Sequence, residues 1–176
     1  MSFADVSDLI TEFVRLHQGW ATPIVFLLAF GESIAFLSIL IPATVILLGV
    51  GALMGQAGLP FLPIWLAAVL GAVLGDWLSY WVGDRYKEGV ARLWPLNKSP
   101  ELLPRGYAFF QRYGWLGVFA GRFLGPLRAS VPLVAGICAM PFWPFQSANL
   151  LSAALWAFIL LAPGAYGVGW LEGWLG

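Results

Sequence analysis

Cysteine, histidine and charged side chains are scarce in this sequence. Cys138 is the only cysteine and His17 the only histidine among the 176 residues. One chain therefore cannot form an internal disulfide, a Cys/His zinc site or a histidine-based catalytic pair. We expect no metal, no cofactor and no enzymatic activity. The net charge is zero and no basic, aromatic-rich patch is present, so nucleic acid is not an expected partner.

Hydrophobic residues make up 60% of the chain and charged residues only 10%, with a mean hydropathy of +0.83. A soluble domain has about 25% charged residues. The only charged residue within 20–59 is Glu32, the only one within 60–83 is Asp76, and 129–171 contain none. Each run is at least as long as the roughly 20 residues that cross a hydrocarbon core. We therefore expect one all-α integral membrane domain over residues 1–176.

The first 18 residues carry Asp5, Asp8 and Glu12 where a secretory signal has basic residues, so we expect this segment to stay on the protein. Its apolar and charged residues fall on opposite sides of a 3.6-residue repeat. That pattern predicts a helix lying along the membrane interface, with a soluble tail as the alternative.

A connector at residues 84–113 holds six of the nine basic residues. The positive-inside rule places such a loop in the cytoplasm. Ser99-Pro100 supplies a helix N-cap followed by a first-turn proline. The connector is therefore expected to contain a second amphipathic helix.

The segments on either side of the connector resemble each other. Gly19-Trp20 and Gly114-Trp115 precede apolar segments that proline and glycine interrupt, and Pro60-Phe61-Leu62-Pro63 and Pro141-Phe142-Trp143-Pro144 follow them. The first repeat, 1–83, would contain a hairpin at about 21–58 and a span at about 64–83. The second, 114–170, would contain a hairpin at about 115–140 and a span at about 145–162.

Paired interrupted segments indicate an inverted repeat of amphipathic helix, re-entrant helical hairpin and transmembrane helix. One hairpin and one span per half would place both termini outside. Backbone N–H and C=O groups that lose their helical hydrogen bonds at the breaks must face protein or water. This predicts a transporter binding site near the membrane midplane. The small residues around Gly71 and Gly75 permit close helix packing and self-association.

Two acids and two arginines lie inside these apolar segments. Glu32 follows Trp20 by 12 residues, about 18 Å along a helix. It is expected either to respond to protons or to form a permanent salt bridge. Arg122 and Arg128 would diverge on one continuous helix, but Gly125-Pro126 lets the chain turn so that both face one pocket. A pair of guanidinium groups suits a phosphate, and pairing with Glu32 and Asp76 is a compatible alternative.

The chain resembles the DedA family of bacterial membrane proteins, relatives of eukaryotic VTT-domain scramblases, from about Gly19 to Gly169. The residues that carry the resemblance are Gly31-Glu32, Pro42, Gly75-Asp76, Tyr80, Gly83, Gly121-Arg122-Phe123, Gly125-Pro126, Arg128, Pro132, Ala135-Gly136, Met140, Phe145, Asn149 and Trp156.

The resemblance implies a multi-pass protein of the bacterial inner membrane with two facing re-entrant hairpins. It also implies a role in moving phospholipids or undecaprenyl phosphate and dependence on the proton motive force. By the same resemblance Glu32 is the essential acid, and Arg122 and Arg128 are the paired arginines. This chain departs from several members by having Thr44 where they have a second acid, a role that Asp76 could fill.

We therefore expect a flippase or scramblase whose partners are membrane lipids with an anionic phospholipid or polyprenyl phosphate head group. Two other classes stay open, a proton-coupled antiporter for small cations and, with less support, an enzyme acting on lipid phosphates. The expected site comprises phosphate-binding Arg122 and Arg128, proton-coupling Glu32 and Asp76, and supporting Asn149, Pro42, Thr44, Gly125, Pro126, Pro132 and Gly136.

Overall fold

The computed structural model describes residues 18–34, 43–91, 102–125, 128 and 130–175. Within these ranges it contains helices and no strand, which confirms the expected all-α class. The helices are α2 (Gln18–Ser33), α3 (Ala43–Ala57), α4 (Phe61–Ala91), α5 (Leu102–Gly121), α6 (Ser130–Ile137) and α7 (Phe142–Leu175). The expected N-terminal amphipathic helix and the cap at Ser99-Pro100 lie outside the described residues.

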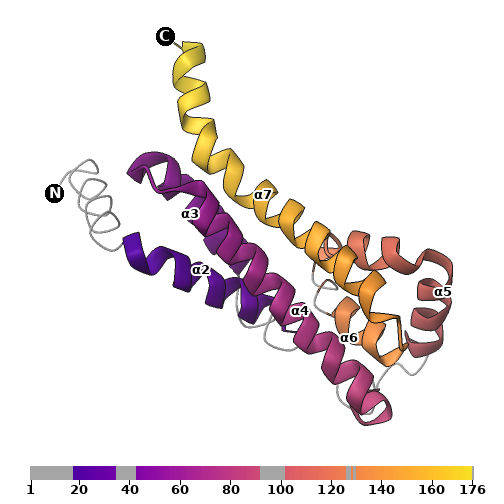
Figure 1. The fold of residues 1–176 in the computed structure, drawn as a ribbon. Helices are drawn as coiled ribbons and strands as arrows, with labels where there is room; N and C mark the ends of the chain where they lie inside the picture. The colour runs from indigo at the N-terminus through magenta and orange to yellow at the C-terminus, as the bar shows by residue number, and fades with distance from the viewer. Residues whose placement is uncertain (1–17, 35–42, 92–101, 126–127, 129, 176) are drawn as a thin grey trace.

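Helices α4 and α7 are long and apolar enough to cross a membrane, over Phe61–Lys87 and Phe142–Gly167. Their 27 and 26 residues extend about 40 Å, more than the roughly 30 Å of a hydrocarbon core. Both begin three residues earlier than expected, because the N–H groups of a first helical turn need no partner and proline is tolerated there. The two helices lie side by side and run in opposite directions (Figure 1).

The remaining helices are too short to cross the same core. Helices α2, α3 and α6 have 16, 15 and 8 residues, or about 24, 22 and 12 Å. Helix α5 bends at Gly114, whose φ of 48° separates residues 102–113 from 115–121. By length alone, none of these straight helical segments matches the two spanning helices.

The short helices pack on the long ones in a reciprocal pattern. Helix α2 contacts α4 and α5 contacts α7, so the first short helix of each half lies on the long helix that follows it. Helix α3 contacts α7 and α6 contacts α4, so the second lies on the long helix of the other half. The two halves are thereby joined at two helix crossings besides the direct contact of α4 with α7.

Close approach of the backbones marks both crossings. A Cβ atom on Gly136 of α6 would lie 2.1 Å from the Tyr80 carbonyl oxygen of α4, and one on Gly83 of α4 would meet α6 in return. At the other crossing, a Cβ on Gly164 of α7 would lie 2.3 Å from the Ala52 nitrogen of α3. Only glycine permits these separations, as is common between helices in membranes.

A spacing of 81 residues relates the two crossings, and it also relates the turns that follow α3 and α6. Gly83 and Gly164 lie 81 positions apart, and so do Gly58 and Ala139, which both have a positive φ, at 68° and 52°. After α3, the Leu59 N–H donates to the Met54 carbonyl, and after α6 the Met140 N–H donates to the Ala135 carbonyl in the same way. Each helix thus ends in a Schellman turn with its own left-handed residue, Gly58 after α3 and Ala139 after α6.

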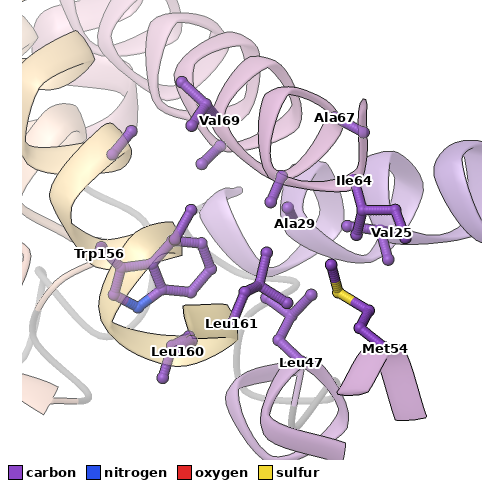
Figure 2. Close-up of a cluster of buried hydrophobic side chains, with 14 of the residues drawn as sticks. Val25, Ala29, Leu47, Met54, Ile64, Ala67, Val69, Trp156, Leu160 and Leu161 are labelled. Carbon is purple, nitrogen blue, oxygen red and sulfur yellow. The ribbon is translucent and has the colours of Figure 1, made fainter. Parts of the chain in front are cut away.

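The apolar core lies between the long helices and the short ones. Its larger cluster joins α2, α3, α4 and α7, with Met54, Ile64 and Leu161 among its most buried members (Figure 2). A smaller cluster surrounds Tyr80 and Phe145, whose rings stack with centroids 4.2 Å apart. Polar side chains are also buried among these helices, and they define the candidate site: Glu32, Ser33, Asp76, Ser79, Arg122, Asn149 and Ser152.

Candidate functional site

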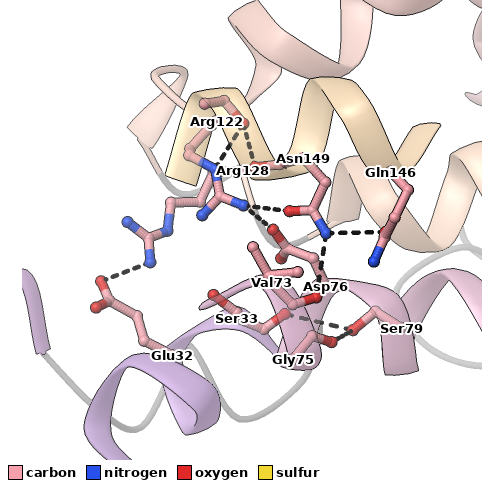
Figure 3. A network of polar contacts seen from close by, with 11 residues as sticks. Glu32, Ser33, Val73, Gly75, Asp76, Ser79, Arg122, Arg128, Gln146 and Asn149 are labelled. Carbon is pink, nitrogen blue, oxygen red and sulfur yellow. Dashed lines mark hydrogen bonds and ion pairs between the residues drawn. The ribbon is translucent and has the colours of Figure 1, made fainter. Parts of the chain in front are cut away.

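The buried polar side chains come together where the short helices end. Helix α2 ends one residue after Glu32, and α5 ends one residue before Arg122. Arg128 precedes α6, and its Nη2 lies 3.2 Å from Glu32 Oε1. Figure 3 shows Arg122 turned toward Asp76 and Asn149, and Arg128 turned toward Glu32. The site is therefore formed by helix ends from both halves, packed against the long helices α4 and α7.

Arg122 is held by three side chains from the two long helices. Its Nη2 donates to Asp76 on α4 and, at 2.7 Å, to Asn149 Oδ1 on α7, while its Nε donates to Ser152 Oγ at 2.9 Å. The Asn149 amide in turn donates to the Val73 carbonyl at 3.1 Å. A charged pair buried in this way is tolerated because the neutral side chains of Asn149 and Ser152 add hydrogen bonds to the arginine. Arg122 thus ties α5 to both long helices.

Arg128 has a looser environment. Its Nη2 is buried and faces Glu32 Oε1, but it makes no hydrogen bond of acceptable geometry within the described part of the chain. Its guanidinium carbon lies 4.5 Å from the centroid of the Trp156 ring, compared with 6.0 Å for that of Arg122. Stacking on an aromatic face stabilises a desolvated cation, so Trp156 acts as a surface for Arg128.

Glu32 connects the two short helices of the first half. Thr44 at the start of α3 donates its hydroxyl to Glu32 Oε1 at 2.6 Å. Glu32 Oε2 and the neighbouring Ser33 Oγ are buried without a hydrogen-bond partner among the described residues. Ser79 on α4 donates to the Ser33 carbonyl at 3.3 Å, which fixes the end of α2 against α4. The carboxylate is therefore anchored on one side only.

A small cavity of about 10 Å³ lies beside the two arginines. It is just large enough for about one water molecule. A phosphate group would not fit unless the groups around it move. The lining residues are Asp76, Val118, Arg122, Arg128, Val131, Pro132 and Ser152. Within the described ranges, no three His, Cys, Asp or Glu side chains are grouped to hold a metal ion.

The structure brings together most of the residues expected at the site, namely Glu32, Thr44, Asp76, Arg122, Arg128, Pro132 and Asn149. Gly125 lies in the exposed turn between α5 and α6 with a φ of 58°. Gly136 packs against the backbone of α4 and does not line the cavity. Pro42 and Pro126 lie outside the described residues.

Ser152 and Trp156 also belong to the site, although the sequence assigned them no role there. They follow Asn149 by three and seven positions on α7, which places all three on one face of the helix. The sequence pattern therefore identifies them as neighbours of Asn149 on this helix. It could not show that they contact the arginines, because those contacts join segments far apart in the chain.

The family model described as the VTT domain matches residues 41–166. Inner membrane protein YabI of Escherichia coli K12 is 35% identical over 156 residues, which are 89% of this chain and 61% of that protein. Inner membrane protein YghB of the same strain is 34% identical over 70% of this chain and 57% of its own length. An uncharacterized Synechocystis membrane protein, slr0232, is 36% identical over 76% of this chain and 62% of its own.

The chain thus spans about three fifths of the length of these curated relatives. No solved structure matches it. The VTT match covers well over half of the chain and includes α3, α4, α6 and nearly all of the site. This chain belongs to the VTT-domain family, the DedA family of membrane proteins.

Proposed function

We propose that this protein is a lipid transporter, of the flippase or scramblase type, that moves lipids with a phosphate head group across the bacterial inner membrane. One observation carries the proposal: two arginines, each facing one carboxylate, lie where helix ends of the two halves meet, Arg122 buried and Arg128 with a side chain only 11% exposed. Charged groups within a membrane domain are costly and usually mark a substrate or ion pathway.

Helix lengths support a pair of re-entrant hairpins. The α2–α3 and α5–α6 pairs consist of helices too short to cross the hydrocarbon core, and they enclose the breaks that carry Glu32 and Arg122. A broken helix is tolerated at that depth where protein or a water-filled cavity covers it. In this arrangement the helix ends bring polar groups to the midplane.

An inverted repeat is supported by three features of the fold. The long helices run antiparallel, the short helices contact them reciprocally, and the turns after α3 and α6 share one geometry at a spacing of 81 residues. Transporters built from such repeats bind their substrates at the repeat interface. The central connector would then be cytoplasmic and both termini outside.

The chemistry of the site suits an anionic head group. Guanidinium groups bind phosphate oxygens through paired N–H donors, and the carboxylates neutralise the arginines between binding events. Glu32 would release Arg128 when it takes up a proton, which would couple transport to the proton motive force. Thr44, which donates to Glu32, stands where several family members have a second acid.

The relatives support the proposed location, since YabI and YghB are named inner membrane proteins. Both spanning segments of this chain also expose large apolar side chains, such as Leu70 and Trp77 on α4 and Phe158 on α7, as a lipid-facing surface requires. The proposed substrates are phospholipids and undecaprenyl phosphate.

Transbilayer movement of fluorescent phosphatidylglycerol and of undecaprenyl phosphate in proteoliposomes tests the proposal. The wild type is expected to accelerate movement of at least one. Arg128→Ala is expected to abolish this movement by removing the guanidinium group that faces Glu32, and Arg122→Ala by leaving Asp76 buried without its cation. Arg112→Ala is the matched control, because Arg112 is an exposed residue of α5 outside the site. Equal rates for the wild type and both site variants would contradict the proposal. Cation-dependent pH changes without lipid movement would favour the antiporter.

A further inference from the structure

The two arginines of the site are held in different ways. Arg122 has hydrogen bonds to Asp76, Asn149 and Ser152, so its Nε and Nη2 are attached to α4 and α7. Displacing Asp76 from Arg122 would also disturb the Asn149 amide, which bonds the Val73 carbonyl. This pair belongs to a closed network that links three helices.

Arg128, in contrast, faces one carboxylate at 3.2 Å without a well-aligned hydrogen bond. Its guanidinium carbon lies over the Trp156 ring, 4.5 Å from the ring centroid. Trp156 stabilises the cation whether or not Glu32 is beside it, because the ring contact does not involve the carboxylate. The partner of Arg128 can therefore change while the arginine stays in position.

Unpartnered polar atoms belong to this second pair and to Ser33, the residue that follows Glu32. Within the described residues, Arg128 Nη2, Glu32 Oε2 and Ser33 Oγ are all buried and lack hydrogen bonds. Glu32 is 6% exposed and Ser33 is 1% exposed. Buried polar groups in folded proteins are normally satisfied, and each exception calls for an explanation. A free donor on Arg128 and a hydroxyl on Ser33 are the groups that would bind phosphate oxygens.

We propose, resting on the proposed function, that Arg128 alone exchanges its carboxylate partner Glu32 for the phosphate of the lipid, while Arg122 remains bound to Asp76. Arg128 is then the substrate-binding cation, Ser33 adds a hydroxyl to the same phosphate, and Arg122 is a positioning residue. The ligand class is a phosphate monoester or diester on a lipid. The two arginines do not share the phosphate as a clamp.

Two double variants test the two ion pairs independently. Each variant removes both charges of one pair and replaces them with amides that can hydrogen-bond to each other. Asp76→Asn with Arg122→Gln neutralises the positioning pair. Glu32→Gln with Arg128→Gln neutralises the exchanging pair. Binding of undecaprenyl phosphate, phosphatidylglycerol and inorganic phosphate to the full chain in phosphatidylcholine nanodiscs is measured by native mass spectrometry.

The Asp76/Arg122 double variant is expected to bind the phosphate lipid within about threefold of the wild type, and the Glu32/Arg128 double variant at least tenfold more weakly. Ser33→Ala should weaken binding severalfold without lowering the unfolding temperature. If the Asp76/Arg122 variant does not fold, Arg122→Lys replaces it and is expected to retain binding, whereas Arg128→Lys loses it.

Equal loss in both double variants, with binding in the wild type, would overturn the division of roles and leave the proposed function standing. No binding of either lipid to the wild type would overturn the proposed function and this assignment together. Binding of inorganic phosphate as tight as that of the lipids would show that the site takes a free anion, which contradicts a lipid ligand.

Discussion

Replacing Asp76 by alanine is expected to destabilise the protein strongly, because it removes the only carboxylate that contacts Arg122 within the described residues. The arginine is 6% exposed and would keep only the neutral partners Asn149 and Ser152. Removing one member of a buried ion pair costs about 3–5 kcal/mol, since the remaining charge stays desolvated. The two neutral hydrogen bonds persist, so we expect a loss of about 3 kcal/mol, at the lower end of that range.

The double variant of Asp76→Asn with Arg122→Gln should cost much less than the sum of its single changes. Replacing both members of a buried pair is often close to neutral, so the coupling free energy should exceed about 2 kcal/mol. An ordinary interhelical hydrogen bond in a membrane contributes about 0.6 kcal/mol on average. The predicted coupling therefore distinguishes a buried ion pair from such a bond.

Reversible unfolding in mixed micelles, or steric trapping in bicelles, measures these free energies. Glu32→Ala serves as the comparison. In this variant Arg128 keeps its contact with Trp156, and its side chain is 11% exposed, so Glu32→Ala should lower the free energy of unfolding less than Asp76→Ala does. A double variant whose loss equals the sum of the single changes at Asp76 and Arg122, or a larger loss in Glu32→Ala than in Asp76→Ala, would contradict a buried ion pair between Asp76 and Arg122.

Three further predictions concern packing, thiol reactivity and the aromatic surface. Gly164→Ala should destabilise the fold by about 1–3 kcal/mol because its Cβ meets the α3 backbone, whereas Gly167→Ala, with open space around it, should be neutral or stabilising. Equal unfolding free energies for these two variants would argue against the crossing of α3 and α7. Burial raises the pKa of Cys138 to about 11, so maleimide labelling near pH 7.5 should be about 100-fold slower than for a thiol of pKa about 9. The labelling rate should rise tenfold per pH unit up to about pH 10, because only the thiolate reacts, and a plateau near pH 9 would contradict the pKa. Trp156→Leu should weaken binding of a phosphate lipid about 5- to 30-fold, the equivalent of about 1–2 kcal/mol of cation–π stabilisation, with Trp156→Phe in between. Identical affinities for the leucine and phenylalanine variants would remove the role of the ring.

Much of the site could be predicted from the sequence because charge is so rare in it. Four charged residues inside apolar segments are conspicuous, and the Gly-Pro break between Arg122 and Arg128 gives a local reason why both can turn inward. The small face of α4 around Gly75 and Asp76 follows from helical periodicity alone. These features depend on residues close in sequence, whose geometry one helix or one turn determines.

The pairing of each acid with each arginine depends instead on how the helices pack. Nothing local indicates that Asp76 contacts Arg122 and that Glu32 contacts Arg128, since the partners come from different halves. The crossing at Gly164 had a signal in the sequence, because Gly83 and Gly164 have the spacing of Pro60 and Pro141. That single spacing aligns Gly83 with Gly164, although it does not indicate which helix each glycine contacts.

The central claim is that the site recognises a lipid by its phosphate. It is tested most directly by comparing the transbilayer rates of two fluorescent lipids with the same acyl chains, phosphatidylglycerol and an uncharged glycosyl diacylglycerol, in the same proteoliposomes. The wild type should accelerate the phosphate lipid and Arg128→Gln should remove this acceleration, while the uncharged lipid stays at the protein-free rate throughout. Equal acceleration of both lipids, unchanged in Arg128→Gln, would contradict it.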